Sequence, residues 1–100
     1  MRVILIEVRE NNKYTGHGQG GSSYYLREVY INPQHVVCIR EDKDAKRFLQ
    51  EGLMPTDLDR KQDFTRIQLN RGQNGIDITV IGTPGMVETQ LNTGKQLLKG

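Results

Sequence analysis

Two alternating segments joined by a glycine-rich turn constrain the fold of this chain more than any other feature. Residues 63–70 (DFTRIQLN) and 76–81 (IDITVI) both alternate between apolar and polar side chains, which is typical of strands with one buried face. The intervening residues 71–75 (RGQNG) carry two glycines and an asparagine, as tight hairpin turns require. The pattern predicts an antiparallel hairpin whose inward side chains are Thr65, Ile67, Leu69, Ile76, Ile78 and Val80.

Three further strands are predicted before this hairpin. Residues 1–8 (MRVILIEV) are apolar on both alternating faces, which predicts a strand covered on both sides. Residues 24–31 (YYLREVYI) and 36–40 (VVCIR) predict a second and a third strand, separated by an Asn-Pro turn at residues 32–34.

A short helix is predicted in the polar middle of the chain. Asp44 is expected to cap it, and Gly52 to end it. The apolar side chains on one face of this helix would be Ala45, Phe48 and Leu49.

A second helix is predicted after the last strand, with Thr83 at its N-cap, Pro84 at its first position and its end near Asn92. Together these elements predict a single domain over residues 1–100. Its class is α+β, with an antiparallel sheet of about five strands, a short middle helix and a C-terminal helix.

Composition disfavours several classes of function. The single cysteine, Cys38, cannot form an internal disulfide, and its apolar strand predicts an inert buried thiol. No HxH, HxxxH or CxxC spacing is present, so we expect no metal site, no cofactor and no enzyme activity. No apolar run is long enough to cross a membrane, and the first ten residues are too charged for a signal peptide, so a cytoplasmic location is expected.

A cluster of glycines in residues 16–23 (GHGQGGSS) is the first candidate binding feature. Successive backbone N–H groups can converge on an anion where glycine frees the backbone, and a histidine adds a donor. The candidate ligands of a phosphate are therefore His17, Gly18, Gly20 and Gly21. A flexible hairpin loop without a ligand is the alternative.

The polar side of the strand at residues 63–70 is the second candidate feature. Phe64 and Arg66 lie side by side there, as a purine ring beside a phosphate would require. Tyr25 and Arg27 repeat this spacing on the second strand, and Arg40 projects from the third. An ordinary solvated face with Phe64 half-buried, or a face buried against another subunit, explains the same pattern.

Some apolar side chains have no evident place in so small a core. They suggest a homo-oligomer, a dimer or higher, with a site shared between subunits. They are Tyr24, Tyr30, Met54, Leu97 and Leu98.

Two segments, 31–42 (INPQHVVCIRED) and 63–91 (DFTRIQLNRGQNGIDITVIGTPGMVETQL), resemble two small families in the order of their elements. One is the FlbD-type flagellar regulators. The other, which also accounts for the predicted oligomer, is the first-described type of phage Thoeris anti-defence sponge, whose oligomers sequester cyclic ADP-ribose signals. That resemblance implies a stacking residue at Phe64, an amide at Asn74 and an arginine at Arg40.

The sequence thus predicts non-catalytic sequestration of a small anionic nucleotide, such as cyclic ADP-ribose or a cyclic oligonucleotide, by an oligomeric phage protein in the host bacterial cytosol. One alternative is a regulatory protein–protein interaction module like the FlbD-type proteins. Another is weak RNA or DNA binding, which the near balance of 14 basic and 12 acidic residues disfavours.

Overall fold

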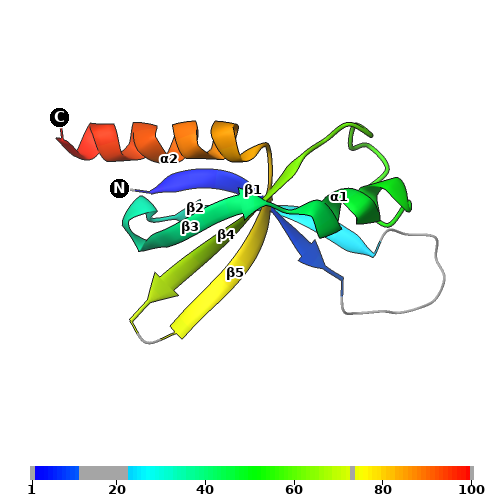
Figure 1. The fold of residues 1–100 in the computed structure, drawn as a ribbon, viewed down its shortest axis with the longest axis horizontal. Coiled ribbons are helices and arrows are strands. Elements are labelled where there is room, and N and C mark those ends of the chain that lie inside the picture. Colours follow the sequence, from blue (N-terminus) through cyan, green and yellow to red (C-terminus); the bar gives the residue numbers. More distant parts are fainter. Residues whose placement is uncertain (1, 12–22, 73, 100) are drawn as a thin grey trace.

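The computed structural model of the chain describes residues 2–11, 23–72 and 74–99 and confirms the predicted α+β class (Figure 1). These described residues form five strands, two α-helices and one 3₁₀ turn. The strands are β1 (Val3–Glu10), β2 (Tyr24–Ile31), β3 (Val36–Glu41), β4 (Phe64–Arg71) and β5 (Asn74–Ile81). The turn is η1 (Pro33–His35), and the helices are α1 (Lys43–Gln50) and α2 (Pro84–Lys99).

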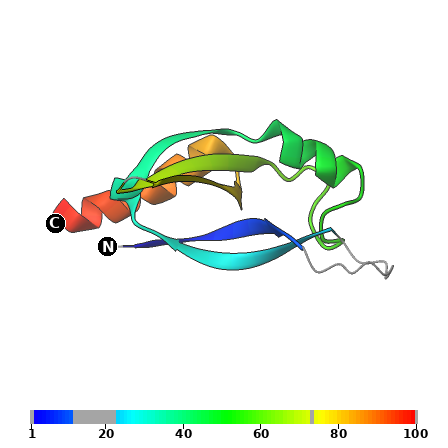
Figure 2. The same cartoon turned by 90° about the horizontal axis from the view of Figure 1, so that it is seen from below.

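The five strands form one antiparallel sheet in the order β2-β1-β5-β4-β3. The sheet bends sharply at its centre, because β1 and β5 pair only at Glu7–Val80 and Val8–Thr79. The β1–β2 hairpin therefore forms one layer and β3, β4 and β5 form another (Figure 2).

Polar side chains cap the helices and the turn. The N-cap of α1 is Asp42, whose carboxylate accepts a hydrogen bond from the Ala45 N–H at 3.0 Å, so the prediction of Asp44 as the cap is wrong. The backbone selects Asp42 because it is the last extended residue, whereas Asp44 already lies in the first helical turn. Thr83 caps α2 as predicted, accepting from the Met86 N–H at 3.1 Å.

Two apolar clusters lie on opposite faces of the sheet. The first joins α2, through Val87 and Leu91, to buried residues of the strands such as Leu5, Ile67 and Val80. The second joins α1 and the segment after it to the other face, and contains Val8, Ala45, Leu49, Met54 and Phe64. Each helix thus covers a different part of the sheet, and neither covers a whole face.

Incomplete coverage explains several departures from the predicted burial. Ile4 and Ile6 are exposed, so β1 is not covered on both sides, and Ile76 is exposed rather than inward. Met54 does have a place in the core. The helix α2 is longer than predicted, because it continues through Gly94 instead of ending near Asn92. Figure 1 shows its last turns extending beyond the sheet. Of the helices described, none is long and apolar enough to cross a membrane.

Candidate functional site

A cleft of about 330 Å³ lies between the β1–β2 hairpin and the β4–β5 hairpin. It exists because β1 and β5 diverge on either side of their two paired positions. Its size falls at the lower end of the range for small-molecule sites. The residues that line it are Arg2, Glu7, Arg9, Arg27, Val29, Tyr30, Ile31, Asn32, His35, Leu69, Ile76 and Ile78.

One part of the cleft wall is apolar, because strand alternation places core-type residues there. Val29 and Ile31 come from β2, and Ile76 and Ile78 come from β5. Ile31 is buried in the first cluster, whereas Ile76 remains exposed. A flat apolar group entering the cleft would therefore cover surface that the fold itself leaves in contact with water.

A buried carboxylate holds two arginines at this cleft. Glu7 is 2% exposed, and its strand register places Arg27 directly opposite, while Arg9 lies two residues along on the same face. Arg27 Nε donates to Glu7 Oε1 at 3.3 Å, and Arg9 Nη1 donates to Glu7 Oε2 at 3.4 Å. A buried carboxylate needs such partners, since burying it unpaired is strongly unfavourable.

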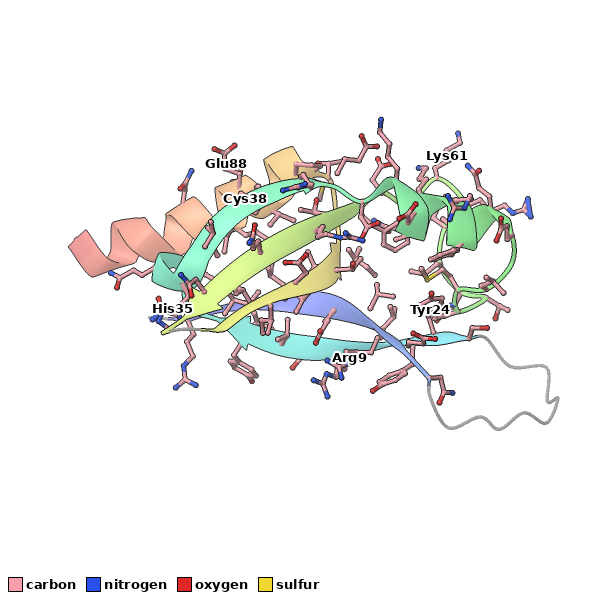
Figure 3. All side chains as sticks on the ribbon, turned by 60° about the horizontal axis from the view of Figure 1, so that its bottom comes forward. Arg9, Tyr24, His35, Cys38, Lys61 and Glu88 are labelled. Carbon is pink, nitrogen blue, oxygen red and sulfur yellow. The ribbon has the colours of Figure 1, made fainter. Side chains whose placement is uncertain are left out.

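The two guanidinium groups keep about half of their side-chain surface exposed while they hold Glu7. The charge of Glu7, hydrogen bonding to it and a further hydrogen bond with Tyr25 raise the pKa of Arg9 above its ordinary value. Two cations against one anion leave a net positive charge, and each guanidinium has further N–H donors for a ligand. Figure 3 shows Arg9 projecting from β1 on the side away from both helices, with His35 near the start of β3.

A second polar cluster lies on the opposite face of the sheet, beside α1. Asp42 is 4% exposed and accepts from the Thr79 hydroxyl at 2.6 Å, as well as capping α1. Arg66 Nε lies 3.5 Å from the same carboxylate. Burial alone would raise the pKa of Asp42, but the hydrogen bonds from Thr79 and Ala45 and the charge of Arg66 outweigh it, and the pKa is lowered.

The structure divides the predicted arginines between two places. Arg27 lines the cleft. Tyr25 lies two residues before Arg27 on the same strand, where it is exposed and pairs with Arg9 in the strand register. Arg40 and Arg66 are direct partners in the β3–β4 register, on the face that carries Asp42. They border a shallow hollow with Lys43 and three acidic residues, so they cannot act on the same phosphate as Arg27.

The prediction that Phe64 is an exposed stacking residue is wrong. Its ring is 0% exposed and packs in the second cluster, because α1 and Met54 cover the strand end from which it projects. The alternation of the strand is as predicted, but both of its faces are buried at this end.

The prediction that Cys38 is buried is also wrong, since the residue is partly exposed. Its thiol donates to Gln68 Oε1 at 3.3 Å and accepts from Arg40 Nη2 at 3.5 Å. The bulge between Val36 and Cys38 shifts the β3–β4 register, so that Cys38 pairs with Gln68 rather than following the simple alternation of β3.

The remaining predicted site residues are only partly placed. His17, Gly18, Gly20 and Gly21 lie outside the described residues. Asn74 is the first residue of β5, where its backbone pairs with Arg71. Within residues 2–11, 23–72 and 74–99, no group of three or more acidic, cysteine or histidine side chains is arranged to hold a metal ion.

Sequence reasoning missed Glu7, Arg9 and His35 as residues of the cleft. Glu7 carried a signal, because it is an acid at the inward position of an otherwise apolar strand and must find a cation. Arg9 lies two residues after Glu7 on β1, so alternation places its side chain on the same face as the Glu7 carboxylate. His35 carried no such signal, since only the folding of η1 against the β4–β5 end brings it there.

Comparison of the chain with protein-family models finds no match, and neither does comparison with curated proteins or with solved structures. The resemblance to the sponge family stays a prediction.

Proposed function

We propose that this protein binds a small phosphorylated nucleotide in the cleft between its two hairpins and sequesters it without chemical change. The observation that carries this proposal is the pair of half-exposed guanidinium groups, Arg9 and Arg27, held by buried Glu7 beside apolar walls. An arginine pair suits a phosphate or pyrophosphate, and the walls suit a base.

Holding the arginines before the ligand arrives favours tight binding. Ordering a long side chain during binding costs about 0.5–1.5 kcal/mol, and Glu7 has already restricted both of them. Each charge-assisted hydrogen bond to phosphate then contributes roughly 1.5–3 kcal/mol. This site replaces the predicted one built around Phe64, and it keeps Arg27 and Tyr25.

Isothermal titration calorimetry with cyclic ADP-ribose, a cyclic dinucleotide and AMP tests the proposal, with adenosine and inorganic phosphate as the two partial ligands. We expect at least one nucleotide to bind and adenosine to bind at least tenfold more weakly. Chromatography of the ligand recovered after denaturing the protein should show it unchanged. Absence of binding by all three nucleotides, or a converted ligand, contradicts the proposal.

Variants locate the site. Ile76→Asp places a negative charge in the cleft at an exposed position, so it should abolish nucleotide binding and leave the fold intact. Arg9→Ala should weaken binding, whereas Arg47→Ala should not, because Arg47 is a comparably exposed arginine that pairs with Asp44 on α1, outside the cleft. Binding that is unchanged in Ile76→Asp would place the ligand elsewhere.

A further inference from the structure

The outer face of the β1–β2 hairpin carries a contiguous apolar patch, which we define as Ile4, Ile6 and Tyr30. Ile4 and Tyr30 are direct partners in the strand register, and Ile6 lies one row further along, opposite Glu28. Their exposed fractions are 48% for Ile4, 37% for Ile6 and 57% for Tyr30. The other side of the same strand is packed, with Leu5 buried against the α2 cluster.

A strand with apolar side chains on both faces usually has both faces packed against other structure. The exposed fractions show that no helix or strand within residues 2–11, 23–72 and 74–99 packs over the patch. In Figure 2 the β1–β2 hairpin forms the outermost layer on its side of the fold. Single exposed apolar residues are ordinary, but a paired group on a flat ribbon indicates a contact with another protein surface.

Opposite charges flank the patch. Arg2 precedes Ile4, and its guanidinium carbon lies 6.0 Å from the centre of the Tyr30 ring, so its side chain leans over the patch. Glu28 lies on the far side, in the row of Ile6. Among the described residues neither Arg2 nor Glu28 has an ion-pair partner within 4.0 Å. Charge of each sign is thus available at the two ends of one apolar surface.

We propose that a second copy of this chain docks on the patch around a two-fold axis. The axis would lie in the contact plane and cross the strands at the row of Ile4 and Tyr30. Arg2 precedes β1, one row before Ile4 on the same face, and Glu28 lies on β2 one row beyond Ile4. The two-fold operation therefore brings Arg2 of each copy into the Glu28 row of the other, one strand across, within reach of the long arginine side chain. A surface that is complementary to itself in this way selects a copy of itself over an unrelated partner. Arg2 and Tyr30 also line the cleft, but the contact requires no nucleotide, so association measured without ligand tests it separately from the proposed function.

Analytical ultracentrifugation of the full chain without ligand tests the contact. We expect a concentration-dependent dimer, and we expect Tyr30→Asp and Ile4→Asp to raise its dissociation constant by about 10- to 100-fold, as for central interface residues. Val37→Asp is the matched control, because Val37 is as exposed as Tyr30 but lies on β3. A monomer at all concentrations, or a dimer that both patch variants leave unchanged, overturns the proposal.

Exchange of the two charges gives a second and more specific test. Arg2→Glu and Glu28→Arg should each weaken the dimer, because each change places like charges together twice. Mixing the two single variants should restore association, since each copy then carries the charges that its partner lacks. The double variant Arg2→Glu/Glu28→Arg should also dimerise. Failure of the mixture to associate better than either variant alone overturns the two-fold pairing.

Discussion

Replacing Asp42 by alanine should destabilise the protein far more than replacing Asp44, its neighbour two residues along. The Asp42 carboxylate makes three contacts: with the Ala45 N–H, with the Thr79 hydroxyl and with Arg66. Losing the helix cap costs about 1 kcal/mol, and leaving the partly buried Thr79 hydroxyl without its acceptor costs roughly 1–3 kcal/mol. The half-exposed Arg66 pair adds at most about 1 kcal/mol.

These contributions predict a loss of about 3 kcal/mol in the free energy of unfolding for Asp42→Ala, because neighbouring effects do not add fully. For a domain of this size that corresponds to a fall in Tm of roughly 15 °C. Asp44→Ala should cost about 0.5 kcal/mol, since its carboxylate is 59% exposed and pairs with Arg47 on the helix surface.

Urea unfolding followed by circular dichroism measures both variants, and a double-mutant cycle with Thr79→Val isolates the contact between the strand and the cap. We expect a coupling of about 1–2 kcal/mol between Asp42 and Thr79. Equal losses for Asp42→Ala and Asp44→Ala would refute the assignment of the cap. A coupling near zero would refute the role of the Thr79 hydrogen bond.

Three further predictions follow from the same geometry. The pKa of Asp42 is lowered on folding, so its contribution to stability is complete above the ordinary aspartate pKa and is lost as the pH falls through the lowered value. The difference in urea midpoint between wild type and Asp42→Asn should therefore shrink on acidification. A difference that grows would contradict the direction of the pKa shift. Phe64→Ala should cost about 3–5 kcal/mol in denaturant unfolding, as for a large core residue, and a stability loss below about 1 kcal/mol would contradict its burial. Lys46 donates to the carbonyls of residues 61 and 62 and to Asp63, at 3.0, 3.0 and 2.7 Å, and so holds this segment against α1. Lys46→Met should therefore speed proteolysis within residues 52–63, while Lys43→Met, at an exposed position, should not. Equal cleavage rates of the two variants would count against this anchoring role.

Local pattern predicted the elements well, because alternation, turn residues and caps act over a few residues. β2 runs over the predicted residues 24–31, and β4 and β5 pair as the predicted antiparallel hairpin. Ala45, Phe48 and Leu49 lie on one face of α1, and Gly52 follows its end with the positive φ of +82° that glycine tolerates. The cap of α1 was misplaced by two residues, because Asp42 and Asp44 are equivalent until the strand before them is known to end at Glu41.

The candidate site was much less predictable, because alternation says which residues share a face but not what covers that face. Phe64 and Arg66 do share a face, yet α1 covers Phe64 and leaves Arg66 half-exposed. Arg27 and Arg66 looked equivalent as basic residues on strands. The strand register places Arg27 on the face of Thr65, so Arg66 lies on the opposite face.

The sequence by itself determined that this chain forms paired antiparallel strands with two helices, and that one acid lies on the inward side of an apolar strand. Those properties follow from side-chain periodicity and from the unfavourable burial of an unpaired charge. Tertiary structure alone decided where the cleft opens. The cleft lies where β1 and β5 separate beyond their two paired positions. The arginines lie there because the buried Glu7 carboxylate requires positively charged partners.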